Sequence, residues 1–153
     1  MFLEYKAQFE HHCPLLADDL FRNLSPKSFA SLAKIKQTKQ FEKGVRFFSK
    51  GDSARCVYIL QKGKAHLLLT DESKDKHIER LIAPNEIFGL TEAIMNLHYE
   101  TDAEAITPCT FEFIEREDLL GFLRGKPEVC LELVKLLGLN FQKSYKLFFS
   151  SIN

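Results

Sequence analysis

The residues best suited to chemistry lie within positions 84–113. A Pro-Asn turn there leads into Ile-Phe-Gly at 87–89, and a short helical segment is expected over 90–95. The first N–H groups of a helix have no partner inside the helix, so they are free to bind an anion. The backbone N–H groups of Leu90 and Thr91 are therefore candidate, though weak, donors to an anionic ligand.

Several other kinds of chemistry lack the residue pattern that they need. A cupin-type metal site requires two histidines around one intervening residue, and no His-x-His occurs. No Cys-x-x-Cys pair occurs either, which argues against a zinc or iron–sulfur cluster of the usual spacing. A Gly-x-Ser-x-Gly elbow, a P-loop and a dinucleotide fingerprint are also missing. We therefore expect neither an enzyme nor a metal protein, and no cofactor is firmly implied.

The scattered histidines and cysteines have ordinary interpretations. Adjacent His11, His12 and Cys13 point in different directions and would need further ligands, so a plain exposed loop is expected there. Lone histidines are usually surface or core residues. Those in this chain are His66, His77 and His98. If Cys130 faces a partner helix, its oxidation could link two chains, and the alternative is a small apolar packing role.

Composition indicates a globular protein with a mixed surface. The 153 residues suffice for one domain with a core, and Lys plus Arg balance Asp plus Glu, so the net charge is zero. That balance argues against a strongly basic nucleic-acid-binding surface. No signal peptide and no long apolar run is seen, so we expect a cytoplasmic location, reduced thiols and no membrane partner. The 14 Phe residues, with no Trp, are expected to fill a β barrel.

Short strands dominate the middle of the chain. Their regular spacing, with turns at Gly44, Gly51-Asp52, Gly63 and Pro84-Asn85, predicts a sandwich or jelly-roll barrel. The expected strands are 34–41, 45–48, 56–62, 64–71, 76–82, 87–88, 101–105 and 110–115. The fold class that we predict is α+β, mainly β.

Helices are expected on both sides of this barrel. One covers 15–21, and another begins at Pro26 with Ser25 as its N-cap. A third begins at Arg116 and ends near Gly125. The predicted organisation is an N-terminal helical lead over 1–35, a β-roll over 36–115 and helices over 116–153.

The last helix, from Pro127 to about Ser150, is long for a helix that covers one domain. Residues spaced 4-3-4-3-4 along it form an a/d seam with one polar position. They are Cys130, Val134, Leu137, Phe141, Ser144 and Phe148. The seam either pairs with a second copy or packs within its own chain.

Three motifs, in their order and spacing, resemble the cyclic-nucleotide-binding domains, in particular the sensor domain of Crp/Fnr-type transcription regulators. They are the Gly-Asp turn motif at 41–52, the Tyr-Ile strand followed by Gly at 57–65, and the Ile-Phe-Gly at 87–89. The resemblance covers about residues 16–149. It implies a jelly-roll, or double-stranded β-helix, barrel with N-terminal helices and a long C-terminal dimerisation helix.

The resemblance also implies where a ligand would bind. In members that bind cyclic AMP, a Glu after the cassette Gly binds the ribose, and an Arg about ten residues later binds the phosphate. Leu90 and Glu100 hold these places here, and a carboxylate repels a phosphodiester. The predicted cassette is Phe88, Gly89, Leu90, Thr91, Glu92, Glu100 and Thr101. We expect either an effector other than cyclic AMP or a closed pocket.

The function that the resemblance implies is a non-enzymatic sensor that acts as a homodimer. A small-molecule effector would alter the packing of two long helices and so reorient a helix-turn-helix that reads DNA. The sequence ends where that helix-turn-helix would begin, so DNA contact is expected only through a domain absent from this chain. The alternative is a ligand-free protein-interaction or dimerisation module with the same fold.

Overall fold

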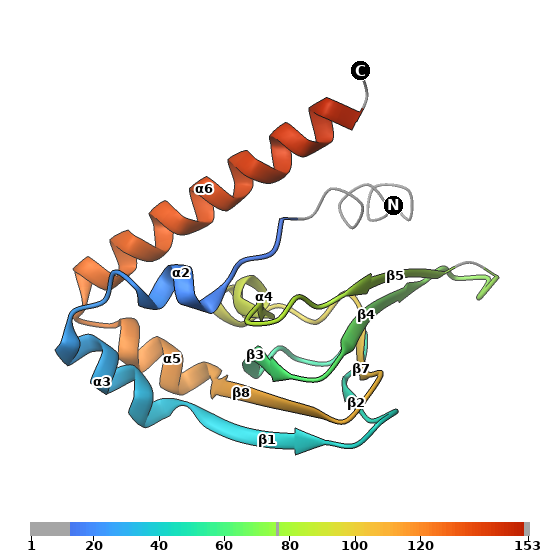
Figure 1. Ribbon diagram of the computed structural model, residues 1–153, viewed down its shortest axis with the longest axis horizontal. Coiled ribbons are helices and arrows are strands. Elements are labelled where there is room, and N and C mark those ends of the chain that lie inside the picture. The colour runs from blue at the N-terminus through green and yellow to red at the C-terminus, as the bar shows by residue number, and fades with distance from the viewer. Residues whose placement is uncertain (1–12, 76, 152–153) are drawn as a thin grey trace.

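The computed structural model describes residues 13–75 and 77–151. Two four-stranded antiparallel sheets, ordered β1-β8-β3-β6 and β2-β7-β4-β5, form a roll with helices gathered at one end (Figure 1). The strands are β1 (Gln37–Phe41), β2 (Arg46–Phe48), β3 (Cys56–Lys62), β4 (Ala65–Thr70), β5 (His77–Leu81), β6 (Ile87–Phe88), β7 (Asp102–Ala105) and β8 (Cys109–Glu115). The helices are α2 (Ala17–Phe21), α3 (Pro26–Ile35), α4 (Leu90–Met95), α5 (Arg116–Leu123) and α6 (Pro127–Ser151). The expected mainly-β α+β roll is confirmed.

The expected bounds hold best around the predicted cassette. Those of β3, β6 and α4 are confirmed residue for residue. The first strand was placed too early, because α3 runs to Ile35 and Lys36 N still donates to Leu32 O. The seventh strand begins at Asp102 rather than at Thr101. The expected first residue of the fifth strand, position 76, lies outside the described residues.

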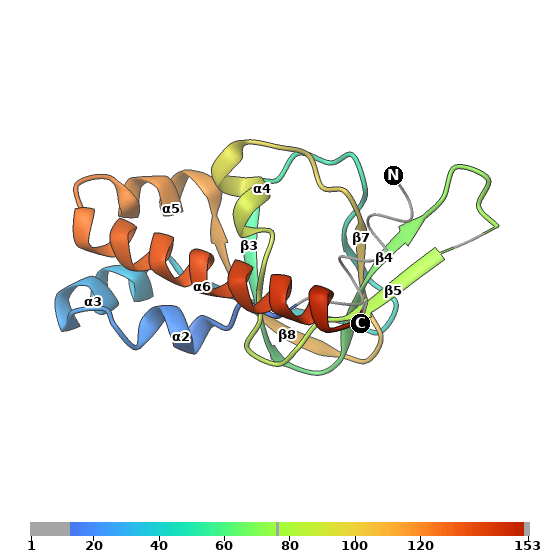
Figure 2. The same cartoon turned by 90° about the horizontal axis from the view of Figure 1, so that it is seen from above.

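Local signals start α3 and end α5 as expected, whereas the helix expected over 15–21 begins only at Ala17, because Leu16 is extended and pairs with Glu86. Ser25 Oγ accepts a hydrogen bond from Ser28 N at 3.1 Å, and Pro26 is the first residue of α3. Gly125, with φ of +77°, separates α5 from α6. The turn between these two helices lets α6 run back past α2 and over the roll (Figure 2).

Strand β3 separates two buried clusters. Its alternation sends Val57 and Ile59 toward the helices and Leu60 into the roll. The helix-side cluster includes Leu15, Leu32, Leu90, Leu119, Phe122 and Leu133. The roll-side cluster includes Phe48, Leu67, Phe88, Tyr99 and Phe111, with Phe41 and Phe47 packed against it. Phenylalanine therefore fills the roll, as predicted.

A buried ion pair fixes the turn between β5 and β6. Arg80 binds Glu86 with two hydrogen bonds of 3.0 and 2.8 Å, and Glu86 is only 1% exposed. Glu86 Oε1 also accepts from Ala83 N at 2.8 Å. Asn85, in the left-handed region with φ of +66°, donates its N–H to Leu60 O. These bonds hold the residues before the cassette against β3.

Helix α6 leaves the body of the protein. Its first half packs on the helix-side cluster, whereas its C-terminal half projects away from the sheets (Figure 1). Among the helices that the structure describes, α6 included, none has the length and apolar character needed to cross a membrane.

We expect Glu86→Gln to destabilise the fold. The amide would remove the Glu86 charge from beside the Arg80 guanidinium, which is 13% exposed, at a cost of about 3 kcal/mol in the free energy of unfolding. Urea unfolding measures this change. Glu79→Gln is the control on β5, the strand that also carries Arg80, because Glu79 is 46% exposed and its pair with His66 should contribute less than about 1 kcal/mol. Equal losses in both variants would contradict a special role for the buried pair.

Candidate functional site

The predicted cassette is one continuous segment in which β6 runs through Gly89 into α4. Gly89 has φ of +79°, and a Cβ there would lie 3.2 Å from Cys56 O and 3.4 Å from the Tyr99 ring. Both the conformation and the close approach favour glycine at this position. Gly89 O accepts the first helical hydrogen bond from Ala93 N at 3.0 Å. The backbone of the cassette is thus set by contact with β3.

The cassette side chains point to different sides of the molecule. Phe88 is buried in the roll, but Leu90 is buried in the helix-side cluster. Thr91 is exposed and Glu92 is half-buried. The place that the resemblance assigns to a ribose-binding Glu is therefore a core position here. It offers no side-chain donor or acceptor to a ligand.

The exit of the cassette presents a carboxylate and then turns inward. Glu100 is exposed on the loop after α4, and Thr101 is 9% exposed. The loop is tied to the segment before β3, because Tyr99 N donates to Asp52 O and Ala54 N donates to Leu97 O. The structure thus brings Glu100 and Thr101 to the rim of the roll.

Tyr99 is the main residue that the sequence analysis missed. Its ring stacks on Phe48 with centroids 3.7 Å apart, and its hydroxyl donates to Cys56 O at 2.8 Å. Only 6% of Tyr99 is exposed. The sequence did contain a signal for the burial of Tyr99. In an extended segment neighbouring side chains point to opposite sides, so an aromatic ring between the polar His98 and Glu100 is expected to turn inward. The ring lies against Gly89 and occupies the space beneath the cassette.

Further aromatic rings line the interior beside Tyr99. Tyr58 stacks on Phe88 at 5.4 Å, and Phe88 meets Phe111 edge to face at 5.6 Å. Burial raises the pKa of Tyr99 to about 12 and raises the pKa of Tyr58 as well. Both hydroxyls are therefore neutral near pH 7. Such an interior disfavours a charged ligand that brings no counter-charge.

Two arginines on the strands of the roll are bound by carboxylates. Arg46 on β2 lies 3.4 Å from Glu104 and 3.6 Å from Asp102 across the strand pair. Sequence spacing could not reveal Arg46 as a neighbour of the site, since it comes from another strand. Arg80 is held by Glu86. Neither guanidinium stands in for the phosphate-binding Arg that the resemblance would place at position 100.

An open cleft of about 560 Å³ lies beyond the C-terminal end of α4. Arg55, Cys56, Asn96 and Arg116 line it, and the predicted cassette residues do not. Burial and the nearby Glu115 raise the pKa of the Cys56 thiol, so it is neutral near pH 7. Arg116 Nε donates to Ala93 O at 2.7 Å and so connects α4 to the start of α5.

Cysteines and histidines form no cluster in the part of the chain that the structure describes. No group of three or more His, Cys, Asp or Glu side chains there could hold a metal ion. All four cysteines are free thiols. Cys130 Sγ contacts Leu123 O of its own chain at 3.4 Å. His11 and His12 lie outside the described residues.

The predicted seam on α6 is divided between two environments. Cys130, Leu137 and Ser144 are half-buried against their own chain. Val134 and Phe141 are 65% and 68% exposed. The side chain of Phe148 lies outside the described residues.

A neighbouring set of apolar side chains on α6 faces solvent instead. We call Leu131, Val134, Phe141 and Tyr145 the exposed stripe; each is at least half exposed. With Gly138 they follow a 3-4-3-4 spacing, which is a heptad pattern. This pattern shares Val134 and Phe141 with the seam and is offset from it by one residue at the other three places. Tyr145 contacts both Phe141 and Phe149 through its ring.

Comparisons with known proteins agree with this architecture. The family model described as the cyclic nucleotide-binding domain matches residues 38–126, more than half of the chain. The cyclic AMP receptor protein of Thermus thermophilus is 26% identical over 118 residues, covering 77% of this chain and 55% of that protein. The CRP-like cAMP-activated global transcriptional regulator of Mycobacterium tuberculosis is 21% identical over 125 residues, covering 82% and 56%.

A solved structure shows the same fold. The N-terminal domain of a transcriptional regulator from Streptomyces coelicolor superimposes with a TM-score of 0.73 at 21% identity, covering 86% of this chain and 92% of that chain. The chain spans about half the length of the curated relatives that it matches.

Tyr99→Phe should change how stability depends on pH. The unfolded chain releases the phenol proton near pH 10, but the folded chain holds it to about pH 12, so stability is lost as the pH rises between these values. The variant keeps the stack on Phe48 and removes the hydroxyl bond, at a cost of about 1 kcal/mol at pH 7. Urea unfolding from pH 7 to 11.5 should show a shallower alkaline decline.

Tyr145→Phe is the matched control when all proteins are measured as monomers, since Tyr145 is 54% exposed in a single chain. It should follow the parent protein throughout the alkaline range. A Tyr99→Phe curve parallel to that of the parent would show that this phenol does not cause the decline.

Proposed function

The chain belongs to the cyclic nucleotide-binding domain family, and from that membership we propose that it is the regulatory sensor domain of a Crp/Fnr-type transcription regulator. The observation that carries the proposal is the cassette, in which β6 runs through Gly89 into α4 against the roll. This segment lies within the residues that the family model matches. Residues 36–115 would be the sensing roll, flanked by the lead over 1–35 and the helices over 116–153. The domain would regulate in the cytoplasm and catalyse nothing itself.

The effector that we propose is a small molecule other than a cyclic mononucleotide. Leu90 is buried away from the roll, and Glu100 would repel a phosphodiester. Arg46 is held by two carboxylates, and aromatic rings fill the interior beneath Gly89. The names of the relatives from Thermus thermophilus and Mycobacterium tuberculosis include cyclic AMP. The contacts above argue against proposing the same ligand for this chain.

Signalling would run through a homodimer in which the exposed stripes of two α6 helices pair. An aromatic and aliphatic face of this kind, on a helix that projects from the body, is the kind of surface that protein association buries. Gly138 would allow close approach of the two backbones. DNA would be contacted only through a further domain that these residues do not include.

A second candidate is a ligand-free interaction or dimerisation module of the same fold. The stack of Tyr99 on Phe48 favours it, because an intrachain ring takes the space beneath the cassette. The two candidates differ in one respect: a sensor is stabilised by its effector in proportion to the logarithm of ligand excess. A thermal-shift screen of cyclic nucleotides, cyclic dinucleotides, haem and small organic acids separates them.

We expect cyclic AMP and cyclic GMP to bind more weakly than a Kd of about 1 mM, measured by titration calorimetry. Glu100→Arg is the informative variant, because residue 100 is exposed and its replacement should not disturb the core. If the cassette is open, the new guanidinium should tighten cyclic AMP binding about tenfold. Unchanged affinity would favour the closed pocket, and micromolar binding by the parent would refute the reading of Leu90 and Glu100.

Phe141→Glu should convert the dimer to a monomer. The side chain is 68% exposed in one chain, so a carboxylate there disrupts pairing without opening the monomer core. Gln142→Glu adds the same charge on the adjacent exposed position and should remain dimeric. Sedimentation velocity gives the mass of each. Leu137 is a poorer probe, because it packs against the helix-side cluster. A Phe141→Glu protein with the parent mass would exclude the exposed stripe as the interface.

A further inference from the structure

The segment from Cys13 to Asp18, which we call the strap, joins the turn before the cassette to α6. At the cassette end it behaves as a short extra strand. Leu15 O accepts from Ile87 N at 2.7 Å, and Ala17 N donates to Asn85 O at 2.8 Å. Leu16 pairs with Glu86 across these bonds.

The same turn holds the strap through a side chain as well. Asp18 N donates to Asn85 Oδ1 at 2.8 Å. Asn85 is fixed in turn by its left-handed conformation and by its bond to Leu60 O, and Glu86 by its ion pair with Arg80. The cassette end of the strap is therefore rigid, and a displacement of the turn displaces the strap.

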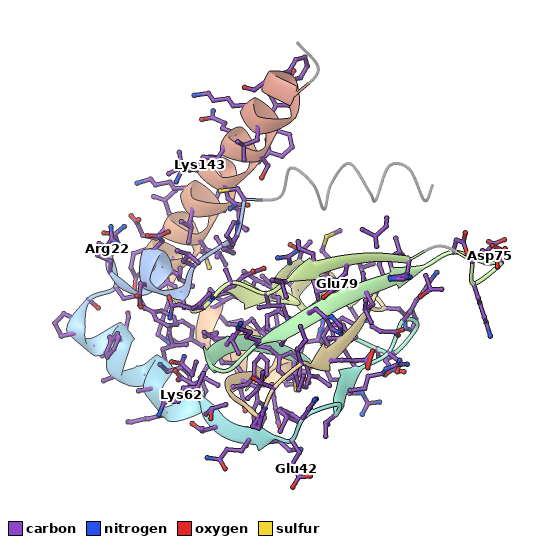
Figure 3. The ribbon with its side chains drawn as sticks, turned by 45° about the vertical axis from the view of Figure 1, so that its right-hand side comes forward. Arg22, Glu42, Lys62, Asp75, Glu79 and Lys143 are labelled. Carbon is purple, nitrogen blue, oxygen red and sulfur yellow. The ribbon has the colours of Figure 1, made fainter. Side chains whose placement is uncertain are left out.

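The other end of the strap is attached to the middle of α6. Asn140 Nδ2 donates to Cys13 O at 2.8 Å, and Cys13 N donates to Ser144 Oγ at 3.2 Å. Figure 3 shows the strap reaching α6 close to the labelled Lys143, and both Cys13 and Lys143 line one cleft of about 270 Å³. These two side-chain bonds join Cys13 to α6 beside the apolar contacts that Leu15, Leu136 and Leu137 make in the helix-side cluster.

Asn140 and Ser144 are sequence neighbours of Phe141 and Tyr145 in the exposed stripe. A displacement of Asn140 and Ser144 therefore also moves Phe141 and Tyr145, since neighbouring residues of a helix shift along its axis and rotate about that axis together. We propose that the strap is a mechanical link that couples the Pro84–Asn85 turn to α6 and so sets the position of the exposed stripe. This inference rests on the proposed function for its biological meaning, but the coupling itself is a property of the unliganded fold.

Hydrogen exchange measured by mass spectrometry tests the coupling from both ends. Asn140→Ala removes the donor to Cys13, and Ser144→Ala removes the acceptor, so two independent variants release the α6 end. Each should speed exchange by at least about threefold at residues 85–88, far from the substitution. Gln142→Ala, exposed on the same helix, is the control and should leave these residues unchanged.

The reverse direction uses Asn85→Gly, which keeps a positive φ available and removes the Oδ1 acceptor. It should speed exchange in α6 between residues 136 and 145 by a similar factor. Asn96→Gly is the matched control, because Asn96 also has a positive φ, at the end of α4. All variants are made in the Phe141→Glu background, so that pairing of α6 does not hide the effect.

Peptides from β3 and β8 report whether the fold is intact, and their exchange should stay at the parent level. Effects that remain confined to the substituted end in all three strap variants would overturn the inference. The readout needs no effector and no dimer. Failure of the ligand screen would therefore count against the proposed function, and failure of long-range exchange would count against the strap alone.

Discussion

The carbonyl group of Cys56 is the point on which the cassette depends. It accepts the Tyr99 hydroxyl at 2.8 Å and lies so close to Gly89 that a Cβ there would sit 3.2 Å away. Strand β3, to which it belongs, is covered on both faces, by helices on one side and by roll residues on the other. A strand buried in this way cannot shift, so it gives the cassette a fixed reference.

Electrostatics decide what such a cassette can accept. The roll interior is built from neutral aromatic groups, and the guanidinium groups of Arg46 and Arg80 are occupied by carboxylates. Moving a phosphodiester into this environment would cost its hydration without a compensating pair. The family fold is thus combined with Leu90 and Glu100 at the two places that the resemblance assigns to ligand contacts, and for this reason the proposed effector is a different chemical signal.

Much of this could be predicted from the sequence, because its signals are local. Gly89 followed by six helix-forming residues defined α4, and Ser25-Pro26 defined the start of α3. Tyr99 and Arg46 were missed because their roles come from packing and pairing between segments distant in the sequence. The predicted seam on α6 shares Val134 and Phe141 with the exposed stripe but differs from it by one residue at three other places, since a heptad pattern does not show which of two adjacent faces the chain covers itself.

Because its own chain covers only part of α6, this helix has both an anchored half and an exposed apolar face. Val129 and Leu133 are buried in the helix-side cluster and anchor the first half, whereas Phe141 and Tyr145 leave the second half with an apolar face in solvent. The first half of α6 is anchored in the core and its middle is joined to the strap by two side-chain bonds, so its C-terminal part can move without disturbing the core. The orientation of its apolar face changes with that movement, and under the proposed function this would let a fold with a rigid roll pass a signal to a partner.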